Sequence, residues 1–145
     1  MTTVYYAHPM SWYGTDAEKA DLQLLRLNYD HVINPSSEEI KQALEHYIKA
    51  HGHANIMQFF ADIVHHQADV VAFRPFSDGR IGAGVAREVF EAHIWGKELV
   101  RIYSGTCGPV CGAPKLLSMG SGTLDLLWAT LTVEETRSRI KRKML

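Results

Sequence analysis

The chain has 145 residues, with 15 Lys and Arg against 16 Asp and Glu, and 46% of it is hydrophobic. This length predicts a single domain over residues 1–145 that buries about two thirds of its unfolded surface. The near-zero net charge argues against a nucleic-acid binder, and the hydrophobic content argues against a disordered chain. There is no basic or apolar leader and no apolar run of about 20 residues, so we expect a cytoplasmic protein that no membrane holds.

The N-terminal part alternates strand and helix patterns. Thr3–Ala7 is rich in β-branched and aromatic residues, which predicts a first strand. Thr15 or Asp16 is suited to cap a helix that ends at Asn28-Tyr29-Asp30. His31–Ile33 is then expected as a short second strand.

Two helices and a buried strand follow. Ser36 or Ser37 is expected to cap a helix with an apolar face, and Asn55–Gln67 is expected as the next helix. Asp69–Phe73 is continuously apolar after its aspartate, as is typical of a central parallel strand that is buried on both faces.

The remaining chain continues the alternation. Its predicted elements are a loop over Arg74–Ala83, a helix over Gly84–Trp95, a strand over Glu98–Tyr103, a glycine-rich stretch over Ser104–Gly122, a strand over Leu124–Leu131 and a capped helix over residues 132–144. This order predicts an α/β fold: a single flavodoxin-like (Rossmann-like) three-layer domain with a mostly parallel sheet. In such sheets ligands bind beyond the carboxyl ends of the strands, so function is expected in the loops that begin at His8, Arg74 and Ser104.

Glu88 is the sharpest local feature. On a helical wheel it lies beside the arc of Val85, Val89 and Ala92 in the helix that follows a strand-end loop. A carboxylate on a buried arc is unfavourable unless it is paired or functional. Pairing with a neighbouring Arg or Lys is the structural alternative.

Asp78 precedes that helix and is a second catalytic candidate. Together with Glu88 it suggests a pair of carboxylates, one a nucleophile and the other an acid or base. The alternative is that Ser77-Asp78-Gly79 is simply a turn.

The first strand and its loop offer further candidates. Tyr5 shares a strand face with Ala7, and its hydroxyl can meet a ligand or pack in the core. The loop side chains suited to stack on a base or to bind it are His8, Ser11, Trp12 and Tyr13. The alternative is a loop that packs on itself.

Three segments carry a family resemblance. Residues 4–9, Val-Tyr-Tyr-Ala-His-Pro, resemble the opening strand and loop of the nucleoside 2-deoxyribosyltransferase superfamily, which includes nucleoside 5'-monophosphate N-glycosidases. Residues 68–73 resemble its central strand. Around Glu88, a glycine four residues before and a Gly-Lys pair eight residues after match the stretch that carries the family's nucleophilic glutamate.

The resemblance implies cleavage of an N-glycosidic bond in a nucleoside or nucleoside 5'-monophosphate. Glu88 is then the nucleophile that forms a glycosyl-enzyme intermediate, Asp78 the acid for the departing base, and Tyr5 the group that positions Glu88 or the sugar. Hydrolysis is favoured slightly over base exchange. The resemblance also implies a homodimer or higher homo-oligomer, with 119–131 and the C-terminal helix as candidate contacts.

The sequence departs from the family at the phosphate site. His8 stands where a glycine is usual, residues 10–15 form an aromatic insert, and the loop at residues 80–83 lacks the serine typical of monophosphate hydrolases. The alternatives for binding a phosphate or substrate are the backbone amides of Gly82, Ala83 and Gly84 and the side chains of Arg80, Ser118 and Ser121.

No metal or cofactor is expected. The eight histidines form no metal-binding motif, and Cys107 and Cys111 have the wrong spacing for a zinc knuckle and are too few for a disulfide framework. Two other functions stay open: a non-catalytic nucleotide-binding module, and a glycohydrolase acting on a dinucleotide such as NAD.

Overall fold

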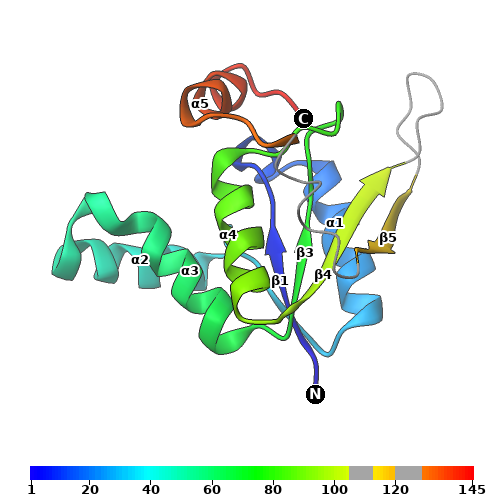
Figure 1. The fold of residues 1–145 in the computed structure, drawn as a ribbon, viewed down its shortest axis with the longest axis horizontal. Helices are drawn as coiled ribbons and strands as arrows, with labels where there is room; N and C mark the ends of the chain where they lie inside the picture. Colours follow the sequence, from blue (N-terminus) through cyan, green and yellow to red (C-terminus); the bar gives the residue numbers. More distant parts are fainter. Residues whose placement is uncertain (105–112, 120–128) are drawn as a thin grey trace.

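We describe a computed structural model of the chain, covering residues 1–104, 113–119 and 129–145 (Figure 1). In these ranges the strands are β1 (Thr3–Ala7), β2 (His31–Ile33), β3 (Val70–Phe73), β4 (Glu98–Ser104) and β5 (Pro114–Ser118). The α-helices are α1 (Asp16–Asn28), α2 (Glu38–His51), α3 (Ile56–Gln67), α4 (Ala83–Ile94) and α5 (Val133–Lys141). Two short 3-10 helices are η1 (Met10–Trp12) and η2 (His53–Asn55).

The strands form one sheet in the order β2-β1-β3-β4-β5 within the described residues. The first four are parallel, and β5 pairs antiparallel with β4. The chain is therefore α/β with a mostly parallel sheet. The order reverses between β1 and β3, because β1 leads outward to β2 while β3 leads outward to β4. Ligands bind at such a switch, beyond the carboxyl ends of the strands.

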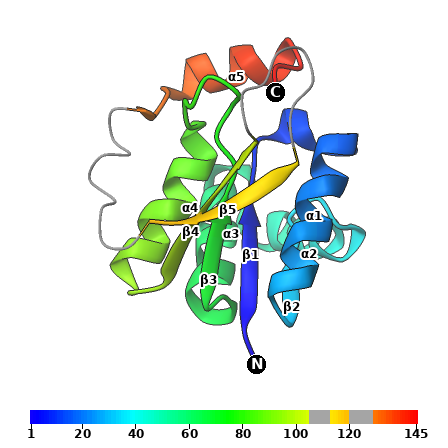
Figure 2. The same ribbon diagram turned by 90° about the vertical axis from the view of Figure 1, so that its right-hand side faces the viewer.

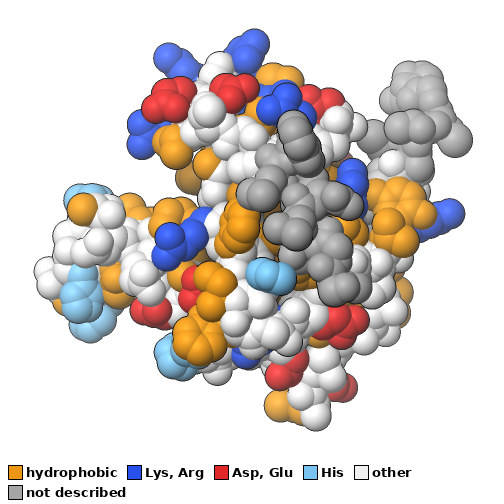
Figure 3. Space-filling view, in the orientation of Figure 1, with side chains coloured by type: hydrophobic (Ala, Val, Ile, Leu, Met, Phe, Trp, Pro, Cys, Tyr) orange, Lys and Arg blue, Asp and Glu red, His pale blue; other side chains and the backbone are white. Residues whose placement is uncertain are grey.

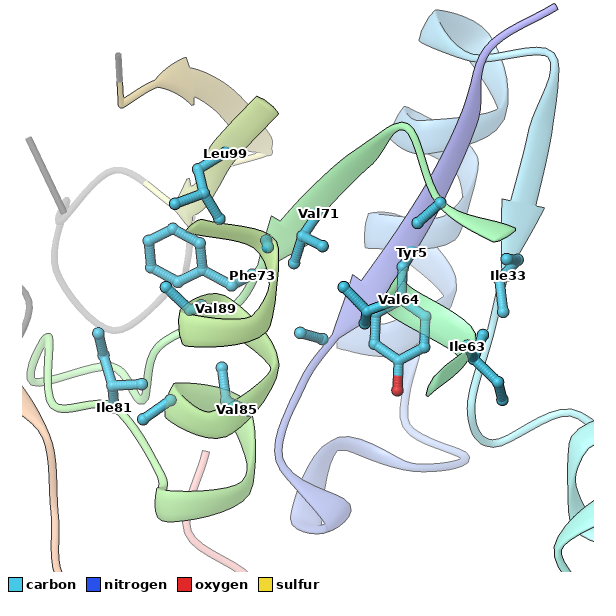
Figure 4. Close-up of a cluster of buried hydrophobic side chains, with 14 residues drawn as sticks. Tyr5, Ile33, Ile63, Val64, Val71, Phe73, Ile81, Val85, Val89 and Leu99 are labelled. Atoms are coloured by element: carbon cyan, nitrogen blue, oxygen red, sulfur yellow. The ribbon is translucent and has the colours of Figure 1, made fainter. Parts of the chain in front are cut away.

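Helices cover both faces of the sheet, with α1 and α4 on opposite sides (Figure 2). Leu22 and Leu25 of α1 pack with Tyr6 in one hydrophobic cluster. Val64 of α3 and Val85 of α4 pack with Tyr5 in the other (Figure 4). Consecutive residues of β1 thus serve different layers, as the strand period of two requires.

Local sequence signals account for the boundaries of most elements. Side chains of Thr15, Ser37 and Thr132 accept hydrogen bonds from the first turns of α1, α2 and α5, and Thr132 with Glu135 forms a full capping box. The predicted bounds of β1 and β2 are confirmed.

Two predictions in the C-terminal part are wrong. The glycine-rich stretch contains β5, an edge strand whose Leu116 packs on the α1 side while Leu117 stays half exposed, so its apolar signal is short. Helix α5 ends at Lys141 rather than near Met144, and Lys143 has a left-handed φ of 54°. Most of the predicted strand over 124–131 lies outside the described residues, and Thr130 makes an isolated bridge with Ile81.

A buried polar cluster joins α1 to the sheet. Arg74, directly after β3, donates from Nε and Nη2 to the two carboxylate oxygens of Asp21 at 3.0 and 2.5 Å. The hydroxyl of Tyr6 donates to Asp21 at 2.6 Å, and Arg74 also reaches Ser104 Oγ at 3.2 Å. Asp21 is 0% exposed. The buried charge of Asp21 is thus paired with Arg74, on the face of the sheet opposite Glu88.

Helix α2 differs from the other helices. It contains no buried residue, although it packs on α3, and both project to one side of the sheet (Figure 1). Across the described ranges, every helix is too short or too polar to cross a membrane.

Candidate active site

Glu88 lies in the second turn of α4 and is 7% exposed. The Tyr5 hydroxyl, from the adjacent strand β1, donates a hydrogen bond to Glu88 Oε2. Among the described residues no second hydrogen bond to the Glu88 carboxyl is found. The structure therefore brings together two of the three predicted catalytic residues, and no cation from the described ranges pairs with the Glu88 carboxyl.

Burial raises the pKa of Glu88 to about 8, against the smaller, opposite effect of the Tyr5 hydrogen bond. Burial, and next the charge of Glu88, raise the pKa of Tyr5 well above its usual value, so the phenol keeps its proton. Strongly perturbed acids of this kind cluster at functional sites.

Glu88 and Tyr5 line a cavity of about 430 Å³. This volume is in the range of small-molecule sites. Most of the other lining side chains are apolar: Pro9, Met10, Tyr13, Pro35, Leu44, Ile56, Met57, Phe60, Val85 and Ile140. The polar ones beside Glu88 and Tyr5 include His8, Lys41 and Thr136. A small, mostly apolar ligand with a few polar groups suits this lining.

His8 lines the cavity, but both of its ring nitrogens are already engaged. Nδ1 lies 3.0 Å from the Tyr6 carbonyl oxygen, and Nε2 lies 2.7 Å from Glu18 Oε2. Each ring nitrogen thus already lies within hydrogen-bond distance of an oxygen atom of the protein. The His8 ring stacks on Tyr6 with centroids 3.7 Å apart. His8 therefore offers its ring, not a free nitrogen, to a ligand.

Glu18 holds His8 in place. Burial alone raises the pKa of Glu18, but hydrogen bonds from His8, from Ser36 Oγ and from the Gly14 amide bring it below its usual value. The charged carboxylate thus ties α1 to the loops after β1 and β2, which positions the cavity wall.

The aromatic loop divides between two environments. Tyr13 lines the cavity, and its stacking on a base stays a prediction. Ser11 and Trp12 are absent from the lining. Trp12 is 5% exposed, and its ring lies 5.3 Å from the guanidinium carbon of Arg74. Within the described part of the chain, Ser11 Oγ and Trp12 Nε1 are buried without hydrogen-bond partners. Trp12 therefore lies against Arg74 rather than against the cavity.

Asp78 is not brought to Glu88. Both of its carboxylate oxygens accept from the Arg139 guanidinium, at 2.9 and 2.7 Å, and the Arg80 amide donates to it at 3.1 Å. The Arg139 hydrogen bond holds the pKa of Asp78 below its usual value. Arg80 is turned elsewhere too, because its Nε donates to the Ala129 carbonyl at 3.2 Å. Neither side chain lines the cavity.

Gly82 and Gly84 line the cavity at the start of α4. No side chain caps the helix from Gly82, but Thr136 Oγ1 of α5 accepts from the Ala83 amide at 2.9 Å. A Cβ on Gly82 would lie 3.2 Å from Thr136 Cγ2, so a glycine permits this close packing. One of the three amides proposed for phosphate is therefore occupied by the protein itself.

Several lining residues were missed by the sequence analysis. Lys41 and Leu44 come from α2, Met57 and Phe60 from α3, and Ile140 from α5. The apolar spacing of α2 and α3 was visible, but periodicity does not say which distant element a face meets. The capping box predicted α5, but nothing local to it predicts contact with α4.

Among the described residues, no three His, Cys, Asp or Glu side chains lie close enough together to hold a metal ion. Ser118 lies on β5 at the sheet edge. Cys107, Cys111 and Ser121 lie outside the described residues. Comparison with known proteins finds no family model that matches this chain and no similar curated protein.

Proposed function

We propose that this protein cleaves the N-glycosidic bond of a nucleoside or nucleoside 5'-monophosphate, with Glu88 as nucleophile. One observation carries the proposal: a buried carboxyl, which bonds to a tyrosine and pairs with no cation in the part of the chain that the structure describes, lines a small apolar cavity beside the strand-order switch. The resemblance of residues 4–9, 68–73 and the Glu88 segment to nucleoside 2-deoxyribosyltransferases supports the same reading. So does the strand order, which we propose is a flavodoxin-like variant with β5 reversed.

The proposed reaction has two displacements. A Glu88 oxygen forms a bond to the anomeric carbon, the bond from that carbon to the base nitrogen breaks, and the base leaves with the electron pair and takes up a proton. Water, or a ring nitrogen of a second base, then forms a bond to the anomeric carbon and loses its proton to solvent. The bond from that carbon to Glu88 breaks, and its electron pair returns to the carboxylate. Tyr5 holds the attacking carboxylate in one orientation, and the apolar walls hold the base and exclude bulk water.

The acid for the departing base is a separate question. Asp78 was the candidate by resemblance, but its two oxygens are occupied by Arg139 and its lowered pKa leaves it without a proton near neutral pH. Tyr13 lines the cavity, and burial raises the pKa of its hydroxyl, so the hydroxyl keeps its proton. We therefore propose Tyr13 as a donor of a hydrogen bond to the base.

A non-catalytic nucleotide-binding module is the second candidate. The observation that favours it is the raised pKa of Glu88, since a neutral carboxyl can donate a hydrogen bond to a ligand without attacking it. We expect a homodimer or larger homo-oligomer in either case, as the resemblance implies.

A panel of nucleosides, nucleoside 5'-monophosphates and NAD tests the proposal, with free base measured by chromatography. Wild type is expected to release base, and Glu88→Gln to be slower by at least about 10³-fold, as for a lost nucleophile. Glu91→Gln is the matched control, because Glu91 lies on the same helix and bonds to Trp95.

The outcomes separate the candidates. Binding without base release favours the binding module, release only from NAD favours the dinucleotide glycohydrolase, and release that requires an added acceptor base favours exchange over hydrolysis. Equal rates for Glu88→Gln and wild type contradict the role of Glu88.

A further inference from the structure

Helix α5 forms one wall of the cavity, although it is remote from Glu88 in the sequence. Thr136 and Ile140, one helical turn apart, both line the cavity. Thr136 Oγ1 also accepts a hydrogen bond from the Ala83 amide of α4, and the Thr136 side chain packs against Gly82. The position of α5 therefore sets the shape of the cavity next to the start of α4.

The loop between β3 and α4 anchors this helix. Arg139 makes its two hydrogen bonds to Asp78, and its guanidinium carbon lies 5.0 Å from the centre of the Phe76 ring. The Arg139 side chain is 15% exposed and that of Asp78 is 48% exposed. A bidentate Arg–carboxylate pair fixes direction as well as distance. Charged side chains of both signs gather over α5 in Figure 3.

We propose that Asp78 is a positioning residue: through Arg139 it holds α5 so that Thr136 and Ile140 complete the substrate-binding wall. Asp78 does not touch the ligand itself, since it is absent from the cavity lining. The kinetic part of this inference rests on the proposed glycosidase function. The structural part, which concerns the attachment of α5, does not.

Steady-state kinetics distinguish positioning from acid catalysis. Asp78→Asn is expected to raise KM about two- to fivefold, as for a half-exposed ion pair, with kcat and its pH profile unchanged. The exchanged pair, Asp78→Arg with Arg139→Asp, is expected to restore much of the wild-type KM. Asp62→Asn is the matched control, because this exposed carboxylate of α3 bonds to Gln58 away from the cavity.

Hydrogen exchange of the Ala83 amide tests, without any substrate, whether the Asp78–Arg139 pair holds α5 in place. Its partner is Thr136 Oγ1, so a loosened α5 is expected to make it exchange faster in Asp78→Asn and near the wild-type rate in the exchanged pair. The amides of β3 are the reference, and unchanged exchange there excludes general destabilisation.

Two results overturn the inference. A loss of kcat at constant KM, with the basic limb of the pH profile removed, assigns Asp78 to proton transfer. Unchanged exchange at Ala83 together with an unchanged KM shows that the pair does not hold α5. If Asp78→Asn exchanges faster at Ala83 but wild type releases no base, the attachment of α5 by this pair is supported and the glycosidase function is refuted.

Discussion

At the scale of single residues, the decisive property is a carboxyl that binds its proton more tightly in the folded state than in the unfolded chain. Burial raises the pKa of Glu88 from 4.5 to about 8. Between these values the folded protein holds more protons than the unfolded one, so the free energy of unfolding falls as pH rises. The maximum slope from one group is about 1.4 kcal/mol per pH unit.

Glu88→Gln is therefore expected to stabilise the protein at neutral pH. The amide carries no charge at any pH and removes this slope, so its advantage in Tm over wild type grows from pH 5 to pH 8. Thermal unfolding followed by circular dichroism measures it, with Glu91→Gln as control. A constant difference across this range contradicts the raised pKa.

Tyr5→Phe tests the partner of that carboxyl. The hydrogen bond from Tyr5 lowers the pKa of Glu88, so its loss raises that pKa above about 8. If ionised Glu88 is the nucleophile, kcat/KM of wild type rises with pH to half its maximum near pH 8, and the curve of Tyr5→Phe lies at higher pH. A rate that falls through the same range shows instead that Glu88 acts in its protonated form.

At the scale of elements, the buried pair on the opposite face binds α1 to the end of β3. Asp21→Asn leaves Arg74 buried with a neutral partner, so we expect a loss of about 3 kcal/mol in the free energy of unfolding. Urea unfolding measures the loss. Asp30→Asn is the control, since Asp30 accepts one exposed bond from the Thr2 amide. A loss below about 1 kcal/mol, the usual value of a surface pair, contradicts this role.

The elements were predictable where their signals are local. The runs that form β1 and β3, and the caps at Thr15 and Thr132, depend on neighbours within a few residues, and the structure has them there. The edge strand β5 was missed because one exposed face leaves it only a two-residue apolar run.

The site was predictable in the same uneven way. The helical arc of α4 placed Glu88 at its buried boundary. Strand alternation separated Tyr5 from Tyr6, but only the family resemblance connected Tyr5 with Glu88. The partner of Asp78 was not predictable, because Arg139 comes from a helix some sixty residues away that no periodicity links to the turn. Which side chain pairs with Asp78 depends on how the helices pack in the folded protein, and no residue spacing in a single sequence reveals that packing.

At the scale of the whole molecule, the described residues cover the apolar side chains of α2 only in part. Its Leu44, Tyr47 and Ile48 are only partly buried in the single chain. We expect sedimentation equilibrium to give at least twice the chain mass of 16.3 kDa. A mass of one chain at all micromolar concentrations contradicts the expected homo-oligomer and leaves the cavity to be completed by one subunit.

The neighbouring tyrosines of β1 separate two tasks that share one strand. Tyr5 bonds to Glu88 in the α4 layer, while Tyr6 bonds to Asp21 in the α1 layer. Tyr6 also stacks on the ring of His8, which lines the cavity, so the two layers meet at this ring. A substitution in the α1 layer is therefore expected to reach the cavity wall through His8, although Glu88 itself belongs to the other layer.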